Sequence, residues 1–381
     1  MSQDRTFSSF ESMSKSKWKE LATKDLKGAS FNEKLIWETP GGLTLDPYYN
    51  EEVRPAVSYL QGYQNQLQTE SDWVPAPRRW VNLALVVVTD AETGNQAALE
   101  ALNHGASGIE FQITQDFNPS NLKTLLEGIS LPHITVGFSL PEGELGCAEK
   151  LLKYFTQQGY DSNEINGYIH CESIPDQLEV LSTLHSLPGY KALVLESVSG
   201  TPLVLSIGNF LASAVQIIDV LIDQKYNLEG LFSQVLFRVH LGRDYFREMA
   251  RLRVLRMLWH QIVFHYGLLD YKPSDVQIQA VTSVNTRDPK NVHDNMLSNT
   301  GQAMAAILGG CNLLSVTPHD QGLQKPNAFS RRMALNITNL LIEEGHFDKV
   351  ADPVAGTYFM ETLVDKMAEK AWEVFQSELS T

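Results

Sequence analysis

Three consecutive residues in the sequence, His170, Cys171 and Glu172, carry side chains that can move protons or act as nucleophiles. They end an apolar run that starts at residue 165, so we expect them at the carboxyl end of a buried strand. A histidine, a thiol and a carboxylate in one cleft could perform acid–base catalysis. The structural alternative is a hydrogen-bonded core histidine beside a small buried cysteine. We prefer this alternative because the sequence indicates no partner of known geometry.

Other polar side chains end apolar runs of the same kind. They are Arg238 and His240 after one run, and Thr282, Ser283 and Asn285 after another. In a barrel of parallel strands, reacting groups stand at these carboxyl ends.

The one locally basic segment is residues 243–266, which has the length of a long helix. Its arginines are Arg243, Arg247, Arg251, Arg253 and Arg256. A functional interpretation is a cradle for an anionic ligand such as a nucleotide phosphate. The alternative, which the sequence favours, is a solvated helix face in which Glu248 pairs with Arg251 at helical spacing.

The elements that must position these groups begin at Trp80, where short apolar runs start to alternate with segments of helical period. This pattern is typical of buried parallel strands with crossover helices. The predicted strands are residues 81–89, 108–113, 133–140, 165–172, 192–198, 203–207, 232–240 and 276–284. Eight strands predict an α/β fold, a closed (β/α)8 TIM-type barrel with C-terminal helices over residues 75–381. The sixth strand is the weakest prediction, because only residues 199–202 separate it from the fifth, too few for a crossover helix.

The alternative fold is an open doubly wound sheet. That fold usually has a glycine-rich turn after its first strand, and residues 88–91 contain no glycine.

Residues 1–74 are predicted to be an N-terminal arm, with a helix over 14–26 and extended, proline-rich chain over 40–78. We expect this arm to lie along the outside of the barrel, because its apolar side chains need a surface to bury against.

The composition, 43% hydrophobic and 20% charged, is typical of a folded globular protein with a large core. Its 381 residues suit two domains or one barrel. The formal charge of −15 argues against a nucleic-acid partner. Residues 203–222 are too interrupted by polar side chains to predict a membrane span, and the start has no apolar signal core. Cys147, Cys171 and Cys311 lack the paired spacing of a metal site, so we expect a cytoplasmic protein without a metal.

Several segments together resemble the methylmalonyl-CoA mutase family. Residues 248–259 resemble the family's long helix, residues 291–295 with 303–310 resemble the next helix, and Asp-Pro-Val-Ala-Gly-Thr-Tyr at 352–358 resembles its Asp-Pro-hydrophobic-Ala-Gly-Ser-Tyr turn. These matches cover roughly the last third of the chain. Residues 18–28 are similar to the start of the family's small subunit.

The resemblance implies a barrel through which an acyl-CoA threads, closed at one end by an adenosylcobalamin domain. The implied reaction is the isomerisation of methylmalonyl-CoA and succinyl-CoA, in which the cofactor supplies the radical chemistry. No cobalamin domain is expected before the chain ends at Thr381. Thr317 stands where the family's cobalamin-binding Asp-x-His-x-x-Gly run has its aspartate, so we interpret residues 317–322 as a loop.

Departures from the family pattern concern its catalytic groups. Placing Gly208 on the first glycine of the family's Gly-Tyr-His-x-x-x-Ala-Gly run puts Asn209 and Phe210 at the tyrosine and the catalytic histidine, and neither is a general acid. His170 stands where the family has a substrate-holding glutamine. Gln279 stands where it has a histidine. Losing several such groups would remove about 3 kcal/mol of transition-state stabilisation for each donor.

We therefore predict a non-catalytic, small-subunit-like barrel with no catalytic residue of its own and no cofactor bound by this chain alone. Its expected partner is a catalytic mutase chain, in a heterodimer, although self-association and acyl-CoA binding stay open. Candidate substrate-binding residues are His170, Gln279 and Arg253, which matches a family arginine and would hold the CoA phosphates. One alternative is an active acyl-CoA mutase barrel whose cobalamin domain is a separate chain. Another is an unrelated barrel enzyme that uses His170, Cys171 and Glu172.

Overall fold

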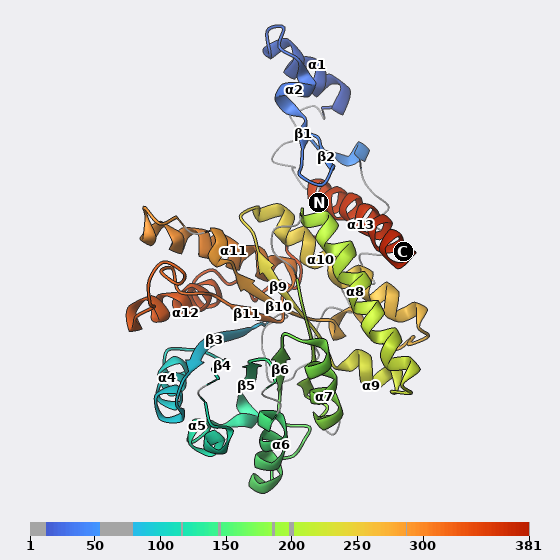
Figure 1. Ribbon diagram of the computed structural model, residues 1–381. Helices are drawn as coiled ribbons and strands as arrows, with labels where there is room; N and C mark the ends of the chain where they lie inside the picture. Colours follow the sequence, from blue (N-terminus) through green and yellow to red (C-terminus); the bar gives the residue numbers. More distant parts are fainter. Residues whose placement is uncertain are drawn as a thin grey trace, which may run out of the picture.

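The structure is a computed structural model that describes residues 13–53, 79–115, 117–143, 146–184, 187–197, 202–286 and 288–380. Parallel strands occupy the middle of the molecule, with helices around them (Figure 1). The strands are β3 (Val81–Val88), β4 (Gly108–Ile113), β5 (Thr135–Leu140), β6 (Gly167–Cys171), β7 (Tyr190–Lys191), β8 (Leu193–Glu196), β9 (Val235–Leu241), β10 (Gln277–Thr282) and β11 (Leu313–Ser315). Their order is β7-β6-β5-β4-β3-β11-β10-β9-β8, and all neighbours are parallel.

The two ends of this order are one stretch of chain, because only Ala192 separates β7 from β8. β7 pairs with β6 on one side and β8 pairs with β9 on the other, so the strands form a ring. Two of the pairings in the ring are short. Only Gly167 and Tyr168 of β6 pair with β7, and only Leu313 and Leu314 of β11 pair with β3. The predicted TIM-type α/β barrel is therefore confirmed.

The predicted strand at 203–207 is wrong. These residues begin helix α8 (Leu203–Asp223), and its buried side chains recur at helical spacing, including Val204, Ile207, Leu211 and Val215. The run looked like a strand because the helix begins with four apolar residues in its first five. Strand β11 was missed because it has only three residues. The described residues contain nine barrel strands, and the predicted count of eight is reached only when β7 and β8 are taken as one stretch interrupted at Ala192.

Helices cover the outside of the ring. They are α4 (Ala91–Asn103), α5 (Leu122–Leu125), α6 (Gly146–Gln158), α7 (Ile174–Leu184), α8 (Leu203–Asp223), α9 (Leu228–Ser233), α10 (Tyr245–His265), α11 (Asn295–Gly309), α12 (Ala328–Glu343) and α13 (Tyr358–Leu379). Short 3-10 helices lie at Glu51–Val53, Pro119–Asn121, Leu131–His133, Pro273–Asp275, Val284–Thr286 and Val292–Asp294. The apolar core lies between the ring and these helices.

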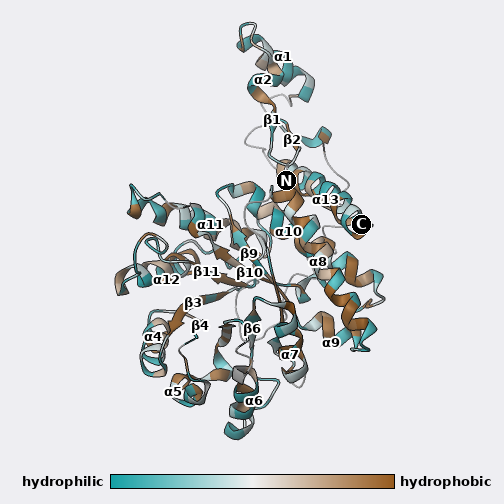
Figure 2. Cartoon of the chain, viewed as in Figure 1, coloured by the Kyte–Doolittle hydropathy of each residue, from teal (hydrophilic) through white to brown (hydrophobic). Residues whose placement is uncertain are grey.

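Helix α8 is hydrophobic over much of its surface (Figure 2). By length and composition alone it could cross a membrane, contrary to the expectation that its polar residues exclude this. Half of its apolar stretch is buried inside the protein, where it packs against α13 and α10. Core helices of globular proteins commonly have this composition.

Gly208 allows α8 to approach α13 closely. A Cβ at this position would lie 2.6 Å from the carbonyl oxygen of Ala371 and 2.6 Å from Cβ of Val374. We expect Gly208→Ala to lower the free energy of unfolding by about 1–3 kcal/mol, because the overpacking exceeds the gain in helix propensity. The matched control is Gly301→Ala in α11, where the new Cβ meets nothing within 4 Å. Urea denaturation should show a loss for the first variant only, and equal stabilities would contradict the packing argument.

The N-terminal arm contains α1 (Lys15–Asp25), α2 (Phe31–Leu35) and an antiparallel hairpin of β1 (Trp37–Glu38) and β2 (Thr44–Leu45). The helix predicted over 14–26 is confirmed. The hairpin packs against the barrel helices, since Leu45 is buried and Lys366 of α13 donates to the Thr44 carbonyl at 2.8 Å.

The first two helices depart from the expected arrangement. Neither α1 nor α2 has a buried residue, and both stand away from the barrel (Figure 1). In the described part of the arm, the hairpin and the residues that follow it as far as the 3-10 helix Glu51–Val53 therefore lie along the outside. Residues 54–78, which include the predicted boundary near residue 74 and most of the extended chain, lie outside the described residues.

Candidate functional site

A charged pair lies inside the ring, where polar side chains project from neighbouring strands. Nη2 of Arg238 on β9 donates to Oε1 of Glu110 on β4 at 2.8 Å, and both side chains are buried. Ser139 and Tyr168 also donate to Glu110, at 2.6 and 2.5 Å. Burial alone would raise the pKa of Glu110, but the guanidinium and these hydrogen bonds hold it below its usual range. Glu110 therefore stays ionised, and its negative charge is balanced by Arg238.

Gln279 on β10 completes this network from the opposite side. Its Nε2 donates to Oε2 of Glu110 at 2.9 Å and lies 3.1 Å from the Tyr168 hydroxyl, and its Oε1 accepts from Nε of Arg238 at 3.1 Å. The side chain is fully buried. Gln279, a predicted substrate-binding residue, thus already forms hydrogen bonds with the protein's own groups.

His170 on β6 extends the network to the mouth of the barrel. Nη1 of Arg238 lies 3.1 Å from Nδ1 of His170, and an arginine can only donate. The proton of a neutral His170 ring is therefore on Nε2, which lies 3.1 Å from Oε2 of Glu196 on β8. His240 on β9 contacts the other oxygen of Glu196.

Glu196 is consequently held between two histidines. Burial alone would raise its pKa, but the hydrogen bonds from His170 and His240 and the charge of Arg238 hold that pKa well below its usual range. The mouth thus combines Glu110, Glu172 and Glu196 with a single guanidinium among its lining residues. The three carboxylates outnumber the guanidinium, so the summed charge of these four groups is negative.

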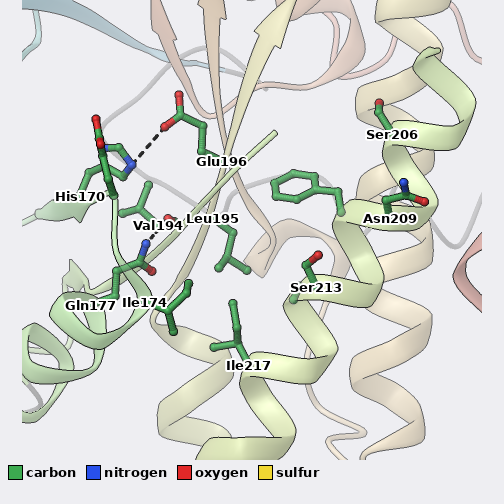
Figure 3. A pocket seen from close by; sticks show the side chains of 13 residues that line it. His170, Ile174, Gln177, Val194, Leu195, Glu196, Ser206, Asn209, Ser213 and Ile217 are labelled. Atoms are coloured by element: carbon green, nitrogen blue, oxygen red, sulfur yellow. Dashed lines mark hydrogen bonds and ion pairs between the residues drawn. The ribbon is translucent and has the colours of Figure 1, made fainter. Parts of the chain in front are cut away.

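Two hollows meet at His170, Glu172 and Glu196. A hollow of about 410 Å³ lies at the mouth of the ring. A second, of about 540 Å³, lies between α7 and α8 and is shown in Figure 3. Asn209 and Phe210, the two residues placed at the family's tyrosine and histidine, both line this second hollow.

The sequence placed His170, Cys171 and Glu172 in one cleft, and the structure does not bring all three together. Side chains alternate along a strand, so Cys171 points away from His170 into the outer core. Burial raises the pKa of the Cys171 thiol to about 12, which leaves it unreactive at neutral pH. The structure therefore gives no support to the barrel enzyme that would use these three residues.

Asn209 and Phe210 lie in the second turn of α8 instead of at the end of a strand. Neither side chain can act as a general acid.

The arginines of α10 are mostly structural. Arg251, Arg253 and Arg256 are buried, so the predicted solvated face is wrong, although Arg251 does pair with Glu248 at 3.3 Å. Arg256 donates to four acceptors that include the carbonyls of Val276 and Gly310. These contacts fix α10 to the amino-terminal ends of β10 and β11.

Arg253, the predicted ligand of the CoA phosphates, lies in the same buried layer. It pairs with Asp352, just before α13, and with Glu361 of α13 at 3.1 Å. The guanidinium thus has two carboxylate partners inside the protein. Its role in binding CoA stays a prediction.

The residues at 317–322 do not fit a cobalamin ligand. His319 is 4% exposed and lies between the rings of His293 and Phe329. Thr317 is buried against Thr282, with their hydroxyls 2.9 Å apart. Among the described residues, no group of three His, Cys, Asp or Glu side chains is arranged to hold a metal ion.

Sequence reasoning missed Glu110, Ser139, Tyr168 and Glu196. One signal was available for Glu110, because a carboxylate in the apolar run at 108–113 must face the inside of the barrel. The others are common residue types, and only the register of distant strands brings them together.

Comparison with known proteins identifies the class of this barrel. The family model described as methylmalonyl-CoA mutase matches residues 194–378. The methylmalonyl-CoA mutase small subunit of Porphyromonas gingivalis is 30% identical, over 98% of this chain and 64% of the relative. The small subunit of Streptomyces virginiae is 26% identical, over 93% and 60%. A methylmalonyl-CoA mutase of Rhizobium meliloti is 22% identical, over 94% and 57%.

The chain is similar to proteins of the methylmalonyl-CoA mutase family, small subunits among them, which confirms the resemblance found in the sequence. It spans about three fifths of the length of these curated relatives.

Proposed function

We propose that this chain is a non-catalytic barrel subunit of an adenosylcobalamin-dependent methylmalonyl-CoA mutase in the cytoplasm. It pairs with a catalytic chain and stabilises it. The observation that carries the proposal is the closed network inside the ring, where Arg238 already forms an ion pair with Glu110 and hydrogen bonds with Gln279 and His170. A substrate carboxylate would find no free cation there.

The charge at the mouth supports the same proposal. Methylmalonyl-CoA carries a carboxylate, and the lining contributes three carboxylates and one guanidinium. Like charges in a cleft of low dielectric repel an anionic substrate. In the assembled enzyme adenosylcobalamin supplies the radical chemistry, and this chain contributes a folded surface that stabilises its partner by mass action.

The test is succinyl-CoA formation from methylmalonyl-CoA with excess adenosylcobalamin. We expect no turnover by this chain alone, and none when an isolated cobalamin domain without a barrel is added. With a complete catalytic chain, a complex should form on size exclusion and melt at a higher temperature than the catalytic chain alone. Clear turnover in the second mixture would overturn the non-catalytic proposal and favour an active barrel with a separate cobalamin chain.

A further inference from the structure

The hollow of about 540 Å³ is a groove between α7 and α8, and we call it the α7–α8 groove. One face of α8 lines it, with residues at helical spacing: Ser206, Asn209, Phe210, Ser213, Ala214 and Ile217. The two helices scarcely touch, whereas α8 packs closely on α13 with its opposite face. From Ser206 to Ile217 the groove follows about 16 Å of helix.

The groove has a polar end and an apolar end. Figure 3 shows His170 and Glu196 at one end and Ile174 and Ile217 near the other. Phe210 and Leu195 add apolar surface to the lining. A ligand that fits would therefore have one polar head and an apolar tail.

Carboxylates dominate the polar end. Glu172 is exposed and, among the described residues, has no hydrogen-bond or ion-pair partner. Glu196 is ionised and lies beside it in the lining. No lysine or arginine is among the lining residues of the groove that the structure describes, and Arg238 behind them is paired with Glu110. A cationic head is favoured there.

A buried acceptor in the same groove points to a donor on the ligand. Nε2 of Gln177 donates to the carbonyls of Cys171 at 2.8 Å and Val194 at 3.1 Å, which fixes the orientation of the amide. Its Oε1 accepts no hydrogen bond in the described part of the chain, although the side chain is only 4% exposed. Figure 3 shows this amide turned toward the groove. A buried acceptor without a donor is costly, so an N–H group nearby would be stabilising.

We propose that the α7–α8 groove binds an apolar amine, with its ammonium among the acceptors Glu172, Glu196 and Oε1 of Gln177 and its alkyl chain along α8. This site goes beyond the proposed function, because its apolar part lies outside the ring, between α7 and α8, and it needs neither a catalytic partner nor cobalamin.

The test uses the full chain and three probes of equal length: n-hexylamine, n-hexanol and n-hexanoate. Isothermal titration should show saturable binding of the amine at one site, with at least about tenfold weaker binding of the alcohol and none of the carboxylate. Equal binding of amine and alcohol, or no saturable binding of the amine at millimolar concentrations, would overturn the proposal.

Variants locate the site. Glu172→Gln should weaken amine binding about tenfold, because one charge-assisted contact is lost. Ser213→Trp should abolish binding by filling the groove from an exposed helix position. The control Glu179→Gln removes an exposed carboxylate of α7 outside the lining and should change nothing. Unchanged binding in both groove variants would place the amine elsewhere and overturn the proposal.

Discussion

Replacing Arg238 with methionine is expected to lower the free energy of unfolding by about 3–5 kcal/mol at neutral pH. The loss arises because Glu110 would remain ionised in the barrel interior, where it is 1% exposed and has no other cation within ion-pair distance among the described residues. Guanidinium denaturation measures the loss. The control is Lys153→Met, which breaks an exposed pair with Glu149 and should cost well under about 1 kcal/mol.

The pH dependence separates this effect from a simple packing defect. In the native protein the pKa of Glu110 is lowered, so its contribution to stability is present above its unfolded pKa and is lost as the pH falls. Arg238 is the largest influence that lowers this pKa, so without it the pKa of Glu110 would rise, and the variant would regain stability relative to the native protein as the pH falls. The difference in the free energy of unfolding between the native protein and Arg238→Met should therefore shrink toward pH 4. A difference that is constant with pH would contradict the ion-pair explanation.

Arg253→Met is expected to cost a similar amount, about 3–5 kcal/mol, because it leaves Asp352 and Glu361 buried without their shared cation. Thermal and chemical denaturation measure the cost. Arg253→Lys is the matched control: it keeps one charge but cannot reach both carboxylates with a planar fork, so an intermediate loss is expected.

Affinity for CoA should not change in Arg253→Lys if the arginine is structural. A loss of CoA binding without a loss of stability would restore its predicted role as a phosphate ligand.

The fold was largely predictable because buried parallel strands and their crossover helices leave a local pattern in the sequence. Runs such as 108–113 are apolar at alternate positions over the length of a strand, and β4 has those bounds. The errors came from segments whose local pattern is ambiguous. Residues 203–207 are apolar in a strand-like run but belong to a longer helical period, and β11 is too short to show any period.

The site was less predictable because its geometry depends on strand register. His170 and Gln279 were identified as polar residues in the barrel, but their partners Glu110 and Glu196 lie far away in sequence. Nothing local shows that Arg238 meets Glu110, since 128 residues separate them. The sequence allowed the polar residues of the barrel to be selected, but it did not show which of them pair with one another.

The two short pairings in the ring, β6 with β7 and β11 with β3, divide it into two half-barrels. One half comprises β3 to β6 and holds Glu110, Tyr168 and His170, whereas the other comprises β8 to β11 and holds Arg238 and Gln279. Hydrogen bonds and ion pairs between these two sets therefore cross from one half to the other. Few backbone hydrogen bonds join the two halves at these junctions, so the buried side chains supply much of the contact between the halves across the barrel axis. Without these side-chain contacts, we expect the halves to separate at the junctions before either half unfolds.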